Sequence, residues 1–96
     1  MITKYNNNIT IEYSIVISKQ AKKKLKSLPG DHRTRITEQI VLLGHDPGNH
    51  HLDIKKLVGL PYYRLRVEDW RVIYERDDEI RVISIEKIDA RGGVYQ

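Results

Sequence analysis

Apolar and charged residues alternate along the second half of the chain, between residues 62 and 88, as in the run YYRLRVEDWRVIYE. Successive side chains of a β-strand point to opposite faces, so this alternation predicts strands that are half buried. Acidic pairs at positions 68–69 and 77–78 interrupt the pattern and are suited to turns. The pattern therefore predicts a three-stranded antiparallel meander.

A tight turn at 68–69 would pair Val67 with Trp70 and Arg66 with Arg71, and directly paired residues share a face of the sheet. One face would then be apolar and bury about 1.5–3 kcal/mol of hydrophobic free energy per side chain. Its predicted members are Leu65, Val67, Trp70, Val72, Tyr74, Ile83 and Ile85. The opposite face would carry Arg64, Arg66 and Arg71.

The first half of the chain predicts one strand and two helices. Residues 1–10 are a polar lead-in, and the β-branched run at 11–18 predicts a strand. Ser18 is a suitable N-cap for a helix that ends at residue 27 or 28, with Ala21, Leu25 and Leu28 on one face.

After the break at Pro29-Gly30, Asp31 is the expected cap of a second helix that runs to about Leu43 and is closed by Gly44. Residues 45–51 predict a loop, and residues 53–61 a linker or short extended segment. The order β-α-α-β-β-β predicts an α+β fold, in which a helical hairpin packs on one face of a small, mostly antiparallel, twisted sheet. Residues 1–96 are expected to form a single domain.

Composition excludes several classes of protein. The chain has 96 residues and no cysteine, so disulfides and thiolate chemistry are excluded and a reducing cytoplasm is the expected location. It contains no run of about 20 apolar residues that would predict a membrane span, and its first ten residues do not resemble a signal peptide. Three histidines in one loop, at positions 45, 50 and 51, lack the spacing of a metal site, so we expect no metal or cofactor.

The net charge of +4 is distributed unevenly. Ten lysines and arginines accompany five acidic residues up to position 61, whereas seven accompany eight from position 62 onward. The position of the arginines in the second half is therefore more informative than the total. Like charges opposite each other destabilise a sheet, so three arginines on one face indicate an anionic ligand, and nucleic acid is the common polyanion of cells.

The segments KKLVGLPYYRLRVEDWRVIYE and IEKIDARGGVYQ resemble the RelE/ParE superfamily of bacterial toxins from toxin–antitoxin pairs. The resemblance extends from about residue 11 to the end of the chain. RelE-like members are ribosome-dependent endoribonucleases that cut mRNA in the A site, whereas ParE-like members share the fold but poison DNA gyrase. The resemblance also implies a RelB-like antitoxin partner, contact with the ribosome, and a cytoplasmic protein that has no membrane association.

RelE enzymes use two basic residues before the hairpin, an arginine after it, and an arginine and a tyrosine near the C-terminus. By position, the resemblance assigns these roles to Arg64 and Arg66, to Arg71, and to Arg91 and Tyr95. The first two positions hold arginine where the best-known members have lysine. All five positions are filled, which favours the RelE branch over the alternatives, a gyrase inhibitor or an inactive member that only binds antitoxin.

Metal-independent RNA cleavage requires charge stabilisation at the phosphate and a general base for the ribose 2′-OH. Arginine stays protonated in proteins, so the arginines suit charge stabilisation, and the general base is Tyr95, a carboxylate such as Glu86, or a ribosomal group. Further lysines are candidates for contact with RNA or the ribosome, the alternative being a solvated surface. They are Lys22, Lys23, Lys26, Lys55 and Lys56.

Overall fold

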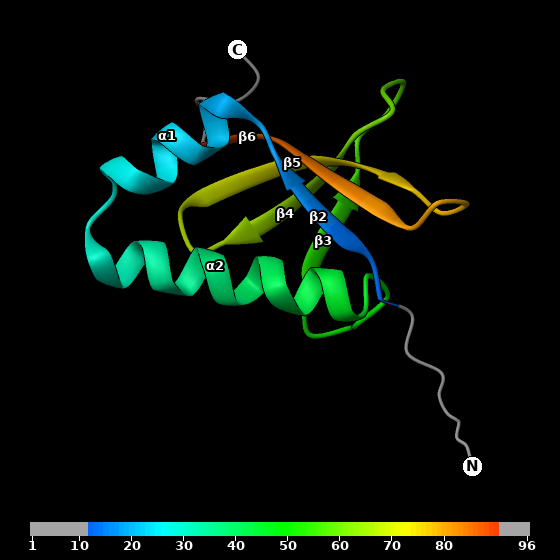
Figure 1. Ribbon diagram of the computed structural model, residues 1–96, viewed down its shortest axis with the longest axis horizontal. Helices are drawn as coiled ribbons and strands as arrows, with labels where there is room; N and C mark the ends of the chain where they lie inside the picture. Colours follow the sequence, from blue (N-terminus) through cyan, green and yellow to red (C-terminus); the bar gives the residue numbers. More distant parts are fainter. Residues whose placement is uncertain (1–11, 91–96) are drawn as a thin grey trace.

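The computed structural model describes residues 12–90, which form five strands and two helices (Figure 1). In chain order these are β2 (Ser14–Ile17), α1 (Lys19–Ser27), α2 (Gly30–His45), β3 (Asp53–Lys56), β4 (Tyr63–Val67), β5 (Trp70–Asp77) and β6 (Val82–Ala90). The predicted α+β class is confirmed. The expected lead-in at residues 1–10 lies outside the described residues.

The strands form one sheet in the order β2-β6-β5-β4-β3. β3, β4, β5 and β6 are joined by antiparallel pairing, and β2 lies parallel to β6 at one edge. The predicted meander is thus present, and its first turn pairs Val67 with Trp70 as expected. The sheet is larger than predicted because Asp53–Lys56, which we expected to belong to a linker, pairs with β4 as an additional edge strand.

The first helix begins as its sequence predicts, since the Ser18 side chain accepts a hydrogen bond from the Ala21 backbone amide at 3.1 Å. The second helix differs at both ends. Its N-cap is Pro29, and Asp31 lies inside the first turn, where a negative charge still favours the helix dipole. Gly44 does not close the helix but lies within it, because an added Cβ there would approach Ile15 Cδ1 to 3.1 Å. Helix α2 therefore packs closely against β2 at this point.

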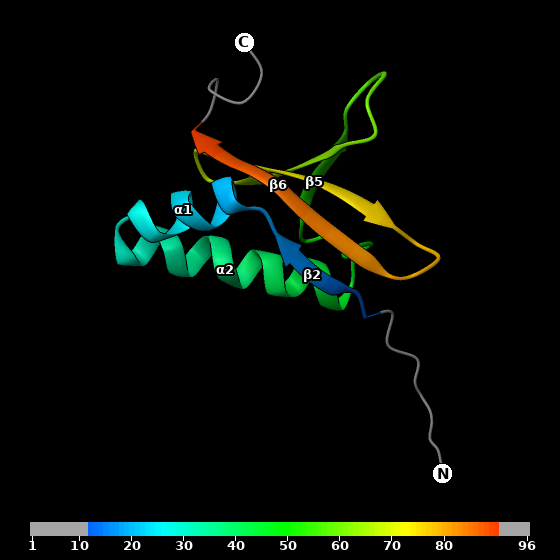
Figure 2. The same cartoon turned by 45° about the horizontal axis from the view of Figure 1, so that its top comes forward.

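Both helices lie on one side of the sheet, as Figure 2 shows. The predicted apolar face is buried beneath them, except that Trp70 is half buried and packs at the margin of the core. Sequence analysis did not single out Ile88, which is fully buried on the same face. No helix in residues 12–90 has the length and apolar character needed to cross a membrane. Within those residues, the other face of the sheet is not covered by a helix, and we call it the open face.

Candidate nucleic-acid interface

The open face carries the three sheet arginines. Arg66 on β4 is the direct register partner of Arg71 on β5, so the two side chains share a face, as the alternation predicts. Arg64 lies two residues before Arg66 on β4 and therefore shares their parity. The other two predicted site residues, Arg91 and Tyr95, lie outside the described residues.

Arg64 is held by the edge strand that sequence analysis missed. Its Nη2 donates to Asp53 Oδ1 at 3.1 Å, and Asp53 is the register partner of Arg66. The Arg64 side chain is 22% exposed, and its Nε is buried with no acceptor among the described residues. A buried donor without an acceptor is costly, so this position favours a ligand that brings an oxygen acceptor.

Carboxylates and carbonyl groups surround the arginines. Arg66 Nε donates to the Glu68 carbonyl oxygen at 3.2 Å, and Arg71 Nη1 donates to the Trp70 carbonyl oxygen at 3.5 Å. Asp89 is the register partner of Arg71 and pairs with Lys24 of α1 at 3.6 Å. The cluster is therefore partly neutralised at its rim, while Arg66 and Arg71 still face each other across the strand pair.

Trp70 links this region to the helical layer. Its Nε1 donates to His32 Nδ1 at 2.9 Å, and the two rings meet edge to face with centroids 5.9 Å apart. His32 belongs to the first turn of α2. Because Trp70 directly precedes Arg71 on β5, this contact fixes the start of the strand that carries Arg71.

The candidate lysines fall in three places. Lys55 is the register partner of Arg64 and shares the open face. Lys56 points to the other side, where its Nζ donates to the Leu60 carbonyl oxygen at 2.6 Å and lies 5.2 Å from the Tyr63 ring centroid. Lys22, Lys23 and Lys26 lie on α1, in the helical layer. Of these lysines, the structure brings Lys55 to the arginines.

A small cavity opens on the open face beside the arginines. It has a volume of about 270 Å³ and is lined by Tyr62, Ile73, Glu86 and Lys87. Ile73 is the register partner of both Arg64 and Lys87, so the cavity adjoins the arginine cluster directly. Sequence analysis singled out Glu86 and missed the other three. The alternating pattern placed Ile73 on the charged face, which was the available signal.

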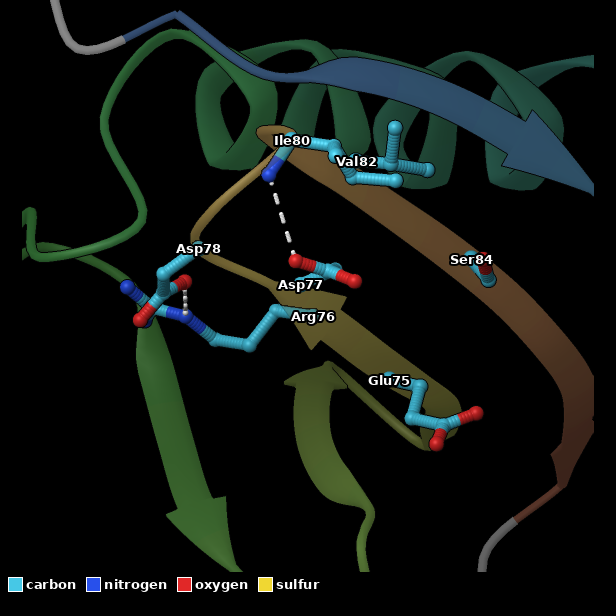
Figure 3. Close-up of a pocket in the computed structure, with 7 residues that line it drawn as sticks. All are labelled: Glu75, Arg76, Asp77, Asp78, Ile80, Val82 and Ser84. Carbon is cyan, nitrogen blue, oxygen red and sulfur yellow. Dashed lines mark hydrogen bonds and ion pairs between the residues drawn. The ribbon is translucent and has the colours of Figure 1, made fainter.

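The largest cavity, about 410 Å³, lies at the far end of β5 and β6 (Figure 3). It is lined by Glu75, Arg76, Asp77, Asp78, Ile80, Val82 and Ser84. Arg76 Nε pairs with Asp78 Oδ1 at 2.8 Å, which confirms the surface pairing expected for this arginine. The Arg76 and Tyr13 side chains bond to Asp78 and hold the pKa of its carboxyl below the usual range. This acidic end of the sheet is unsuited to RNA phosphates.

The histidine loop behaves as a structural segment in this part of the chain. His50 and His51 stack with centroids 4.2 Å apart, and His45 Nδ1 lies 2.8 Å from Glu12 Oε2. Within residues 12–90, no three His, Asp or Glu side chains are gathered as metal ligands. Nucleic-acid chemistry at this surface would therefore depend on its cationic groups.

Known proteins match this chain along most of its length. The family model described as "ParE toxin of type II toxin-antitoxin system, parDE" matches residues 15–95. A protein named RelE1 from Methanocaldococcus jannaschii is 34% identical over 88 residues, which are 90% of this chain and 98% of that relative.

Solved structures give the same picture. A chain from the archaeal RelE–RelB complex of Pyrococcus horikoshii OT3 superposes with a TM-score of 0.74 at 37% identity, covering 85% of this chain and 98% of that one. A chain of the intact E. coli RelBE toxin–antitoxin complex gives a TM-score of 0.69 at 20% identity, over 83% of this chain and 96% of the other. The second match concerns the fold alone.

Proposed function

Because this chain belongs to the RelE/ParE superfamily of type II toxin–antitoxin toxins and is of the RelE kind, we propose that it is a ribosome-dependent endoribonuclease. Its substrate would be mRNA in the A site, and its effect would be to inhibit translation. The observation that carries this proposal is the pairing of Arg66 with Arg71 on the open face, with Arg64 beside them.

The proposed reaction is attack of a ribose 2′-OH on the adjacent phosphate. The O2′–P bond forms, the P–O5′ bond breaks, and the products are a 2′,3′-cyclic phosphate and a 5′-OH. Guanidinium groups bind phosphate oxygens bidentately, so Arg66 and Arg71 would stabilise the charge that develops on the phosphorane. The buried Nε of Arg64 supplies a further donor from the same strand. Arg91 and Tyr95 complete the proposed set.

A general base must remove the 2′-OH proton, and the arginines cannot do so. The candidates are Tyr95, Glu86, which lines the adjacent cavity, or a ribosomal group. A rate that rises with pH between about 5 and 9 on ribosome-bound mRNA would support a side-chain base that titrates in that range. A flat profile would indicate a ribosomal group. Since the arginines take the role of charge stabilisation, we propose that cleavage needs no metal bound by the toxin.

The proposed partners are the ribosome, mRNA and a RelB-like antitoxin. Matched chains come from crystal structures of RelE–RelB complexes, which supports a cognate antitoxin for this protein. We also propose that Lys55 adds to the RNA-binding surface, and that Lys22, Lys23 and Lys26 on α1, together with Lys56, contact ribosomal RNA. A ribosomal target places the protein in the cytoplasm.

The matched family model is named for ParE, so inhibition of DNA gyrase is the alternative to be tested. Purified protein should be incubated in parallel with ribosomes carrying a defined message and with gyrase in a supercoiling assay. We expect cleavage of the ribosome-bound message and unchanged supercoiling. Intact message together with inhibited supercoiling would replace the proposal with the gyrase alternative. A protein that does neither and still binds antitoxin would be an inactive member.

A further inference from the structure

The cavity lined by Tyr62, Ile73, Glu86 and Lys87 has features of a binding site that the cleavage chemistry does not explain. It receives residues from β5, from β6 and from the residue that precedes β4. A carboxylate beside an arginine cluster that binds RNA would repel phosphates, so Glu86 weakens the site unless it has a separate role. The cavity volume of about 270 Å³ is slightly below the range for drug-sized ligands and is suited to one flat ring system.

A β-bulge brings the two charged residues of the cavity to the same face. The pairing of β5 with β6 shifts register between Ile73 and Tyr74, so that Ile73 pairs with Lys87 and Tyr74 pairs with Ile85. Glu86 is thus the extra residue. In a regular strand Glu86 and Lys87 would point to opposite faces, whereas both line the same cavity here.

The start of α1 supports this bulge from behind. Ser18 Oγ donates to the Glu86 carbonyl oxygen at 2.7 Å. Gln20 bonds to Ile88 in both directions, accepting from its amide at 3.2 Å and donating to its carbonyl oxygen at 3.4 Å. The β2 strand ends at Ile17, so these side chains replace the strand pairing that β6 would otherwise lose. The position of Glu86 is therefore built into the fold.

The cavity is one nucleotide away from the arginines. Ile73 lies two residues after Arg71 on β5, and two residues of a strand span about 7 Å. Arg64 and Lys87 flank Ile73 on the neighbouring strands. A phosphate held by Arg66 and Arg71 would consequently place the base of an adjoining nucleotide over Ile73, beside the Tyr62 ring. Aromatic rings of this kind are common stacking platforms for unpaired bases.

We infer that this cavity binds a guanine base next to the scissile phosphate, an inference that rests on the proposed RNA cleavage. The Watson–Crick edge of guanine presents two adjacent donors, N1–H and N2–H, and a carboxylate accepts both. Lys87 would donate to the guanine O6. Adenine presents N1 as an acceptor beside its N6 donor, which repels a carboxylate. Glu86 is then a specificity-determining residue, and Ser18 is the positioning residue behind it.

The test is a substitution that reverses the preference. Glu86→Gln presents one acceptor and one donor, which match the N6–H and N1 of adenine. Ribosomes should be programmed with messages that carry guanine or adenine at each A-site position, and cleavage rates should be measured by primer extension. Glu75→Gln is the matched control, since Glu75 lies on β5 at the acidic end and loses the same charge.

We expect the wild-type protein to cut next to guanine on the order of tenfold faster than next to adenine, and Glu86→Gln to lose or invert that ratio. Glu75→Gln should keep it. Absence of preference in the wild type, or equal slowing of all messages by Glu86→Gln, would overturn the inference while leaving RNA cleavage intact. The second result would assign Glu86 as the general base.

Failure of the wild type to cleave any message would instead refute the proposed function. An NMR titration of the isolated protein then decides the inference separately. Guanosine monophosphate should shift the amide signals of Glu86 and Lys87 at lower concentration than adenosine monophosphate does. Equal shifts from both nucleotides would overturn it.

Discussion

The two faces of the sheet use the same strands in opposite ways. Leu65 and Arg66 are neighbours on β4, yet Leu65 is fully buried under the helices and Arg66 is exposed on the open face. On the covered face, apolar side chains from every strand and both helices satisfy one another. On the open face, Arg66 stands opposite Arg71, an arrangement that costs the fold stability.

This difference separates what holds the protein together from what it does. The open face retains a repulsive pair and surrounds it with carboxylates, Asp53 on one side and Asp89 on the other. A surface selected for stability alone would have alternating charges. Substitutions on the covered face should therefore change stability, and those on the open face should change activity.

The largest expected effect is on the open face. Arg71→Ala should lower the rate of cleavage of ribosome-bound message by about 100–1000-fold, because a donor that stabilises developing charge is lost. Its free energy of unfolding should change by less than about 1 kcal/mol. Arg81→Ala removes an equal charge from the turn before β6 and should leave the rate unchanged. Equal loss in both variants would show that only total charge matters.

On the covered face, Leu65→Ala should lower the free energy of unfolding by about 2–5 kcal/mol, because it leaves a cavity beneath the helices. Urea unfolding followed by Trp70 fluorescence measures this directly. Arg66→Ala, one residue along the strand, should change stability by less than about 1 kcal/mol. Comparable destabilisation by the two substitutions would contradict the division between faces.

A smaller effect of opposite sign is expected at Tyr74. Its ring is fully buried, its hydroxyl has no hydrogen-bond partner among the described residues, and burial raises its pKa far above the ordinary range. Tyr74→Phe removes this unsatisfied group and should stabilise the fold by about 1 kcal/mol. Tyr63→Phe is the control, since the stacked Tyr63 is only partly buried and should change stability little. Destabilisation by Tyr74→Phe would indicate that the hydroxyl is bonded.

The smallest effect depends on pH. The pKa of Asp78 is lowered in the folded state by Arg76 and Tyr13, so its contribution to stability is complete above the ordinary aspartate pKa of about 3.9. That contribution is lost as the pH falls through the lowered value. Asp78→Asn should therefore melt at a lower temperature than the wild type at pH 7, and the difference should vanish near pH 2. A constant difference would exclude this carboxylate as its cause.

Much of the fold follows from local patterns. Strict alternation in β4 and β5 fixed the first turn, the pairing of Arg66 with Arg71, and the apolar face. The Ser18 cap and the spacing of Ala21 fixed the first helix. These features depend on residues close together in sequence, so a single chain is enough to predict them.

The features that sequence analysis missed depend on distant residues. The β3 strand has four residues and little apolar character, and it becomes a strand because β4 offers it a partner. The bulge at Glu86 depends on side chains of Ser18 and Gln20, 68 residues away from the groups they contact. The second helix continues through Gly44 because β2 packs against it. Local propensity carries no information about such contacts.

The most direct test of the open face as a site of RNA cleavage is primer extension on mRNA from cells induced to make the wild-type protein or Arg71→Ala, with equal amounts of folded protein confirmed. We predict breaks within codons along translated messages for the wild type and intact messages for Arg71→Ala. Intact messages in cells whose growth the wild-type protein arrests, or the same breaks from both proteins, would contradict the account.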